Sequence, residues 1–292
     1  DEEQPMSAAG DFDVYYCGDE DDGHAKKNKW VKTWLPDDTN EEDDDKEWFW
    51  FDKEGKLFRA SENKKNSVET AADAEKYKLD EGTLTSDDGK VAKLIGKKKV
   101  NSKDYWFRDD GVMLSKFYKI NDAMFYFGGA DDGSMKTGSQ SIKDNAGDTY
   151  KFYFYTKDQT TDKYQTPKAG NKLKKGAGVV GNQSNKLYYY GLLLTADDYK
   201  YQVVTLKDND GQNVKFIINS NGSIQHSYGT TYKEDGQDLI VVDEVLGKEY
   251  KDSEGNAQTG TAKYVEDGQY KYGFKSGVEN KVSDVDLTKF YN

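Results

Sequence analysis

An aromatic cluster followed by a polar turn and a glycine recurs along this chain, and this recurrence limits the folds that it can adopt. In each copy, aromatic residues alternate over a short stretch, as they do on one face of a β-strand. An Asp, Asn or Glu then precedes a Gly, as in a tight turn. The copies occupy residues 14–28, 48–60, 104–117, 124–139, 152–166, 187–203, 214–228, 248–261 and 269–278. We therefore expect each copy to form a β-hairpin.

A glycine ends the short turns because a tight hairpin turn needs a residue at positive φ. These glycines are Gly55, Gly111, Gly222 and Gly255. The stretch "FYFGGADDGSMKTG" (125–138) has the paired glycines and aspartates of a phosphate or metal loop, but it matches the same turn with two additional residues. The GxGxxG spacing at 176–181 is followed by another aromatic hairpin, so it also predicts a loop or strand and not a dinucleotide site.

Stacking of successive hairpins explains the composition. Only 35% of the chain is hydrophobic, while 14% is aromatic, so the apolar surface is concentrated in rings. A lone hairpin is marginal in water, whereas stacked hairpins bury their rings against each other. The sequence therefore predicts an all-β fold, a β-hairpin solenoid of tandem aromatic-rich repeats.

Three segments are expected along the chain: an N-terminal tail at 1–13, the repeat array at 14–278 and a C-terminal tail at 279–292. The array has an irregular insertion at about 61–100. Within it, "NSVETAADAEKYKL" (66–79) predicts one short helix, with Ser67 as its N-cap.

The chain is acidic, with 54 Asp and Glu against 42 Lys and Arg and a net charge of -12. This charge argues against nucleic acids and anionic lipids as partners, because both require a basic surface. The longest apolar runs fall far short of the ~20 residues that a membrane span needs, so no membrane insertion is expected. The single cysteine, Cys17, excludes an intrachain disulfide, and its strand-like neighbours predict a buried side chain.

No cofactor or metal is expected. His24 and His226 have no Cys or second His at zinc-ligand spacing. The acidic stretches 18–23 and 40–47 offer oxygen ligands but not the spacing of an EF-hand, which favours solvated turns and leaves calcium as an open alternative. Paired carboxylates occur in most turns, so they give no specific signal for a glycosidase.

The units resemble the cell-wall-binding repeats of the choline-binding and glucan-binding families. Those repeats combine an aromatic triplet, a short polar turn, Gly-x-Met-x-x-Gly and a final aromatic residue. "GSMKTGS" (133–139) carries the Gly-x-Met-x-Thr-Gly part, and "GVMLSKF" (111–117) keeps its Gly, Met and final aromatic. "WFWFDKEG" (48–55) has the triplet at the required distance from its glycine. The resemblance spans roughly residues 14–278 and implies an exported protein of the bacterial, Gram-positive cell surface.

In these families, aromatics and a methionine from successive hairpins form a cage that binds quaternary ammonium, or a platform that stacks on sugars. The resemblance therefore implies the following ligand-binding residues: Trp48, Phe49, Trp50, Tyr105, Trp106, Met113, Phe117, Phe125, Tyr126 and Met135. All five tryptophans lie before residue 107, which favours ligand sites in the N-terminal half. The later units lose the first aromatic of the triplet, as at Lys215 and Lys248.

The sequence thus predicts a non-catalytic module, and not an enzyme, that binds cell-wall polymer or another glycan through aromatic stacking between hairpins. Choline is a less favoured ligand, because several cage positions are replaced. The alternative is a degenerate repeat scaffold or adhesin that binds a protein partner and no small ligand. Both readings imply an extracellular protein.

Overall fold

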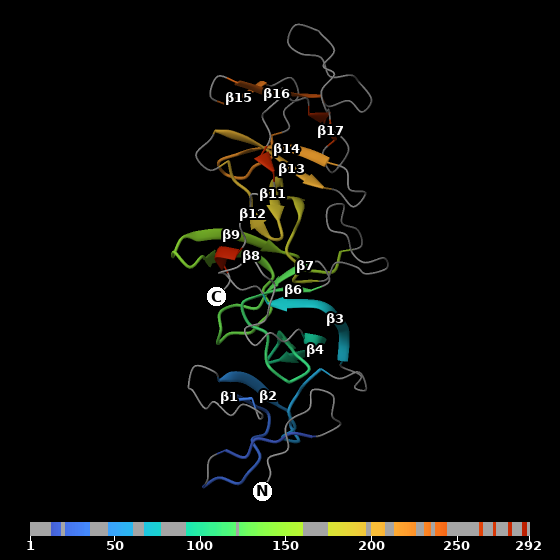
Figure 1. The fold of residues 1–292 in the computed structure, drawn as a ribbon, viewed down its shortest axis with the longest axis vertical. Coiled ribbons are helices and arrows are strands. Elements are labelled where there is room, and N and C mark those ends of the chain that lie inside the picture. Colours follow the sequence, from blue (N-terminus) through green and yellow to red (C-terminus); the bar gives the residue numbers. More distant parts are fainter. Residues whose placement is uncertain are drawn as a thin grey trace. The chain divides into compact units, whose positions relative to one another are not determined.

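The computed structural model describes residues 13–18, 21–35, 46–60, 67–76, 92–120, 123–159, 175–196, 200–207, 213–225, 231–234, 237–243, 263–264, 271–272, 280–281 and 288–290. These residues form β-strands and turns, with one short 3₁₀ helix among them (Figure 1). The chain divides into two compact units, Asp1–Asn121 with Phe125–Lys136, and Asp122–Met124 with Thr137–Asn292.

The first unit is built on two sheets. Strands β1 (Lys29–Thr33) and β2 (Glu47–Phe51) pair antiparallel. The second sheet has the order β5-β4-β3-β6-β7. Its strands are β3 (Ser67–Lys76), β4 (Ala92–Val100), β5 (Lys103–Phe107), β6 (Phe117–Ile120) and β7 (Ala123–Tyr126).

The second unit contains three sheets, with the orders β10-β11-β12-β9-β8, β14-β13-β19 and β15-β16-β18-β17. The first sheet comprises β8 (Gly138–Lys143), β9 (Thr149–Phe154), β10 (Gly181–Gln183), β11 (Lys186–Tyr189) and β12 (Leu192–Leu193). The second comprises β13 (Tyr201–Lys207), β14 (Asn213–Asn219) and β19 (Asn280–Lys281). The third comprises β15 (Thr231–Glu234), β16 (Gln237–Asp243), β17 (Lys263–Tyr264) and β18 (Lys271–Tyr272). The 3₁₀ helix η3 spans Thr288–Phe290.

The same turn closes three of the predicted hairpins. The backbone N–H groups of Gly55, Gly111 and Gly222 donate to the carbonyls three residues earlier, at 3.0, 3.1 and 2.9 Å. Each glycine has a positive φ, between 73° and 91°. The strand residue before each turn forms a bridge with the residue six positions later, as in Phe107 with Met113. The all-β hairpin fold predicted from the repeats is therefore confirmed, while Gly255 lies outside the described residues.

Successive repeats are joined by backbone hydrogen bonds, as a stack of hairpins requires. In the first unit, the N–H of Met113 donates to the Trp48 carbonyl at 2.9 Å, and the N–H of Met135 donates to the Asp104 carbonyl at 2.8 Å. Each bond links a strand that follows one turn to the hairpin before it. In a solenoid, such contacts between neighbouring repeats supply much of the stability.

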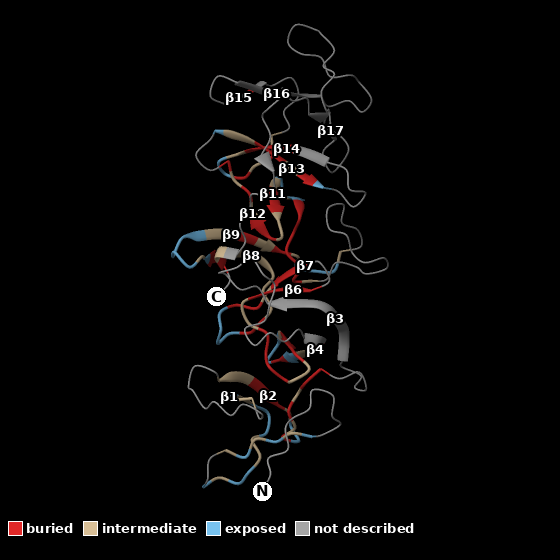
Figure 2. Cartoon of the chain, in the orientation of Figure 1, coloured by how far each residue is buried: buried red, intermediate tan, exposed pale blue. Residues whose placement is uncertain are grey.

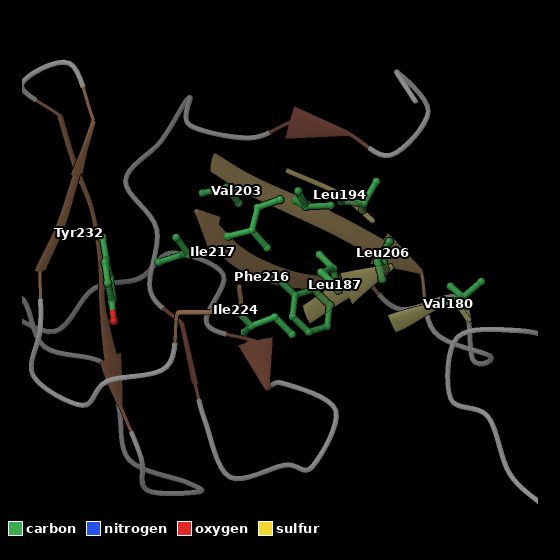
Figure 3. Packing of buried hydrophobic residues seen from close by; sticks show 11 residues of the cluster. Val180, Leu187, Leu194, Val203, Leu206, Phe216, Ile217, Ile224 and Tyr232 are labelled. Carbon is green, nitrogen blue, oxygen red and sulfur yellow. The ribbon is translucent and has the colours of Figure 1, made fainter. Parts of the chain in front are cut away.

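Figure 2 shows in red which segments are buried, and the buried residues are mostly aromatic and branched aliphatic. In the first unit, the β2 residues Phe49, Trp50 and Phe51 are at most 6% exposed. In the second unit, the largest cluster is gathered around Leu187 of β11, Leu206 of β13 and Phe216 of β14 (Figure 3).

The helix predicted at 66–79 is wrong, because residues Ser67–Lys76 form strand β3. This strand pairs antiparallel with β4 and, near its end, with β6. Alanine and glutamate favour helix only weakly, by tenths of a kcal/mol, whereas β4 and β6 supply backbone pairing along much of the strand. Tertiary pairing therefore overrides the local preference.

Cys17 is also placed differently from the prediction, since its side chain is exposed. Its segment contacts the rest of the unit through the bridge between Tyr15 and Lys56 and through two backbone hydrogen bonds, from Lys26 N–H to the Tyr16 carbonyl and from Leu57 N–H to the Val14 carbonyl. Strand-like alternation therefore turns Cys17 outward while it half-buries Tyr16.

Candidate functional site

The first unit contains a cluster of rings that brings together several of the predicted ligand-binding residues. Three of its members are partly exposed, and the others are buried at the centre. We call this group the aromatic cluster, and it consists of Trp30, Trp48, Trp50, Phe58, Val100, Tyr105, Phe107 and Met113.

Trp30 is the ring that joins the two sides of the aromatic cluster. It stands directly opposite Trp50 in the β1–β2 register, with ring centroids 5.2 Å apart in an edge-on arrangement. On its other side, its ring lies 4.8 Å from Tyr105 and 5.7 Å from Phe107, both on β5. Aromatic pairs at these separations attract through offset and edge contacts as well as through burial.

Strand alternation decides which β2 side chains enter the aromatic cluster. Successive residues of a strand point to opposite faces, so Trp48 and Trp50 share one face. Phe49 and Phe51 take the other face, where they pack in a separate cluster with Leu57 and Val112. Phe49, which was predicted as a ligand-binding residue, therefore lies apart from Trp48 and Trp50 and is 2% exposed.

Met113 lies where two repeats meet. Its N–H bonds to Trp48 of the preceding repeat, and its side chain is buried in the aromatic cluster at 4% exposed. The backbone of the next turn lies directly over it: a Cβ on Gly133 would be 2.0 Å from Met113 Sδ. Three successive repeats thus converge on this methionine.

Trp48 forms a solvent-exposed hydrogen bond with an aspartate that lies 83 residues away in sequence. Trp48 Nε1 donates to Asp131 Oδ1 at 2.8 Å, and Lys32 Nζ lies 2.9 Å from the same oxygen. The hydrogen bond from Trp48 and then the Lys32 ammonium lower the pKa of the Asp131 carboxyl. Asp131 remains 66% exposed, so this connection is open to solvent.

Trp50 differs from Trp48 in its hydrogen bonding. It is 6% exposed, and Nε1 has no hydrogen-bond partner among the described residues of the protein. An unsatisfied buried donor of this kind costs about 1–3 kcal/mol. Nearby, burial and then the Asp132 carboxylate raise the pKa of the Tyr105 phenol.

The remaining candidates lie outside the aromatic cluster. Trp106 points to the opposite face of β5 from Tyr105 and packs on Phe125, with centroids 4.7 Å apart. The Lys97 ammonium lies 4.0 Å from the Trp106 ring centroid. Trp106 and Phe125 are each 3% exposed.

Phe117 and Tyr126 form another ring pair, with centroids 4.5 Å apart. Phe117 is 1% exposed, whereas Tyr126 and Met135 are partly exposed. Met135 contributes its backbone N–H to the stack of repeats through the bond to Asp104. The ten predicted residues therefore fall into four groups: the aromatic cluster, the Phe49 face, the Trp106 face and the Phe117–Tyr126 pair with Met135.

Five residues of the site were missed from the sequence: four members of the aromatic cluster, Trp30, Phe58, Val100 and Phe107, and the outer residue Asp131. In the repeat at 104–117, the final aromatic residue, Phe117, comes six residues after the turn glycine, Gly111. Trp30 comes seven residues after Gly23, so it lies one residue beyond the position where the repeat pattern expects a final aromatic. Allowing a variable spacing after the glycine would have found it. Asp131 carried no such signal, because its contact with Trp48 spans two repeats.

The described residues offer neither a metal site nor a membrane-spanning helix. No group of three or more His, Cys, Asp or Glu side chains there is arranged to hold a metal ion. No helix within that part of the chain is long and apolar enough to cross a membrane. In the acidic stretch 18–23, Asp22 is engaged by Lys26 and by His24.

No protein-family model matches the chain, and no curated protein sequence matches it. Solved structures that match it include choline-binding protein F of Streptococcus pneumoniae, crystallised with a peptidoglycan analogue, at 19% identity and TM-score 0.30, covering 92% of this chain and 79% of that one. The choline-binding domain of CbpL from the same species matches at 14% identity and TM-score 0.27, covering 74% and 84%.

CbpJ of Streptococcus pneumoniae matches at 18% identity and TM-score 0.25. This match covers 64% of the present chain and 47% of CbpJ, about half the length of that protein. The first two of these solved structures are described as a choline-binding protein and a choline-binding domain.

Proposed function

We propose that this chain is a non-catalytic module of the bacterial cell surface that binds cell-wall polymer or another glycan by stacking on the aromatic cluster. The observation that carries the proposal is the convergence of Trp30, Trp48, Trp50 and Tyr105 around Met113, from repeats that are far apart in sequence. Such a convergence provides several ring faces within one small region.

The partly exposed members of the aromatic cluster are the surface that a ligand meets first. Trp30, Trp48 and Phe58 are packed against buried rings and yet keep some area in solvent. Tryptophan is well suited to this role, because a large rigid ring loses little conformational entropy when it is covered. The C–H faces of a sugar ring, or the methyl groups of a quaternary ammonium, fit against such a surface.

Cations already lie on two aromatic faces of the first unit, one of which is Phe58 of the aromatic cluster. Lys97 Nζ is 4.0 Å from the Trp106 ring, and Lys98 Nζ is 4.8 Å from the Phe58 ring. A ligand ammonium at either face would compete with a tethered lysine. This competition favours a neutral sugar over choline as the main ligand, and it leaves choline as the second ligand to test.

The test is retention on purified Gram-positive cell walls, with tryptophan fluorescence titrated by glycan fragments and by choline. Trp48→Ala removes an exposed ring of the aromatic cluster, and we expect wall binding at least about tenfold weaker, equal to about 1.4 kcal/mol. The matched control is Trp34→Ala, which removes a partly exposed tryptophan outside the aromatic cluster and should leave binding unchanged. Absence of retention on the walls, or equal losses in both variants, would contradict the proposal.

A scaffold that binds a protein partner is the second candidate. It is favoured by the burial of Phe49, Trp106, Phe117 and Phe125, each at most 3% exposed, since these rings serve packing and present little surface to a small ligand. Retention on cell walls that glycan and choline fail to compete, and that protease treatment of the walls abolishes, would establish this candidate instead.

A further inference from the structure

The indole N–H of Trp50 is a buried donor without a protein partner in the described part of the chain, at the centre of the aromatic cluster. Buried polar groups in folded proteins nearly always have a partner, so this N–H at a candidate binding surface is a position where a water or a ligand atom can act as the acceptor. Trp48, two residues earlier on the same face of β2, has its Nε1 satisfied by Asp131. The two tryptophans therefore differ in the availability of the N–H as well as in burial.

We propose, resting on the function proposed above, that Trp50 Nε1 donates a hydrogen bond to an uncharged oxygen of the bound sugar, a hydroxyl, ring ether or acetamide carbonyl. Trp30 and Trp48 then cover the sugar's C–H faces, while Trp50 donates a hydrogen bond to one of its oxygens. The site is thereby selective for a ligand that carries both an apolar face and an acceptor.

The charge around the site favours an uncharged acceptor. Ring faces carry negative electron density, which repels an anionic oxygen lying over them. The carboxylates of Asp131 and Asp132 lie near the aromatic cluster, but each is paired with a lysine, Lys32 and Lys136, so neither pair offers a free cation to an anionic ligand. The ring faces therefore disfavour a phosphate or carboxylate, and a simple tetraalkylammonium has no acceptor to offer.

Access to Trp50 is through the outer rings, since Trp30, Trp48 and Phe58 are the partly exposed members of the aromatic cluster. Of these, Trp48 donates its indole N–H to the exposed carboxylate of Asp131. Water can take the place of this carboxylate as the acceptor. Movement of Trp48 therefore exposes the interior without breaking a buried bond.

The experiment compares two probes, tri-N-acetylchitotriose, which carries uncharged oxygens, and tetramethylammonium, which carries none. Trp50 is replaced by 3-benzothienylalanine, in which sulfur takes the place of the N–H with little change in shape, and separately by Trp50→Phe. Trp34→Phe is the matched control, because it removes an indole N–H from a tryptophan outside the aromatic cluster. We expect both Trp50 variants to bind the trisaccharide at least about tenfold more weakly and tetramethylammonium within about threefold of wild type. In Trp34→Phe the affinities for both probes should stay unchanged.

Nuclear magnetic resonance of the indole N–H groups gives a second readout. The Trp50 resonance should move downfield on addition of the trisaccharide and stay in place with tetramethylammonium. Trisaccharide binding that is equal in wild type and both Trp50 variants, or a Trp50 resonance that does not move, overturns this inference and leaves the proposed function standing. Absence of binding to both probes and to cell walls overturns the two together.

Discussion

Gly133→Ala is the substitution that most directly tests how the repeats stack. Gly133 has φ +65°, in the left-handed region, where a residue with a Cβ loses about 1–2 kcal/mol. A Cβ there would also lie 2.0 Å from Met113 Sδ and 2.3 Å from Met113 Cε, inside van der Waals contact. Overpacking of this kind adds about 1–3 kcal/mol. We therefore expect a loss of about 2–5 kcal/mol in the unfolding free energy of the first unit.

Urea unfolding followed by tryptophan fluorescence measures this loss, because all five tryptophans lie in the unit that contains Gly133. Gly55→Ala is the matched control. Gly55 has φ +87° in the same unit, and a Cβ there would meet Ala25 Cβ at 3.2 Å, which demands only a small shift. We expect this control to lose about 1–2 kcal/mol, the backbone part alone.

A double-mutant cycle identifies the contact. Met113→Ala alone should cost about 2–5 kcal/mol, as for other buried methionines. In the double variant the overlapping sulfur is gone, so the combined loss should fall short of the sum by about 1–3 kcal/mol. Equal losses for Gly133→Ala and Gly55→Ala, or strict additivity in the cycle, would refute the contact between this turn and Met113.

Three further predictions follow from the described contacts. First, the hydrogen bond from Lys26, followed by those from His24, lowers the pKa of Asp22 to about 2 from 3.8, so its stabilisation is present above pH 3.8 and is lost as the pH falls through about 2. Asp22→Asn should therefore lower the urea midpoint at pH 6 and leave it unchanged at pH 1.5, and a midpoint difference that is constant with pH would contradict this. Second, Phe290 is 7% exposed and packs edge-on against Tyr150 with centroids 5.1 Å apart, so Phe290→Ala should cost about 3 kcal/mol and speed hydrogen exchange in β8 and β9, whereas Phe290→Leu should have a smaller effect. Unchanged exchange in Phe290→Ala would show that the C-terminal segment does not stabilise this hairpin. Third, the exposed Cys17 should react with a maleimide in the folded protein as fast as in urea, and protection that urea removes would argue for burial.

Much of the fold could be predicted from short-range patterns, because the chemistry of a hairpin is local. A glycine at positive φ, an Asp or Asn at the start of the turn and alternating rings on the strand lie within about ten residues of each other. Asp52 shows this directly, as its carboxylate accepts hydrogen bonds from the backbone N–H groups of Glu54 and Lys56 inside one turn. Each turn can therefore be recognised without knowledge of its neighbours.

The candidate site was predictable only in part. Trp48, Trp50, Tyr105 and Met113 were named from the repeat pattern, and the structure brings them into one cluster. Phe49 was named by the same pattern, but alternation along β2 places it on the opposite face. The pattern marks positions in a repeat, whereas membership of a cluster depends on how one hairpin lies on the next.

Taken alone, the sequence determined the hairpin units, the turn glycines and the aromatic character of the core, since each depends on residues that are close along the chain. Only the tertiary structure decided that Ser67–Lys76 is a strand, because the partners β4 and β6 that satisfy its backbone come from elsewhere in the chain. It also decided that Cys17 faces solvent, that Trp30 completes the aromatic cluster and that Asp131 holds Trp48 across 83 residues. Contacts of this kind depend on the stacking of whole repeats, and no local spacing encodes them.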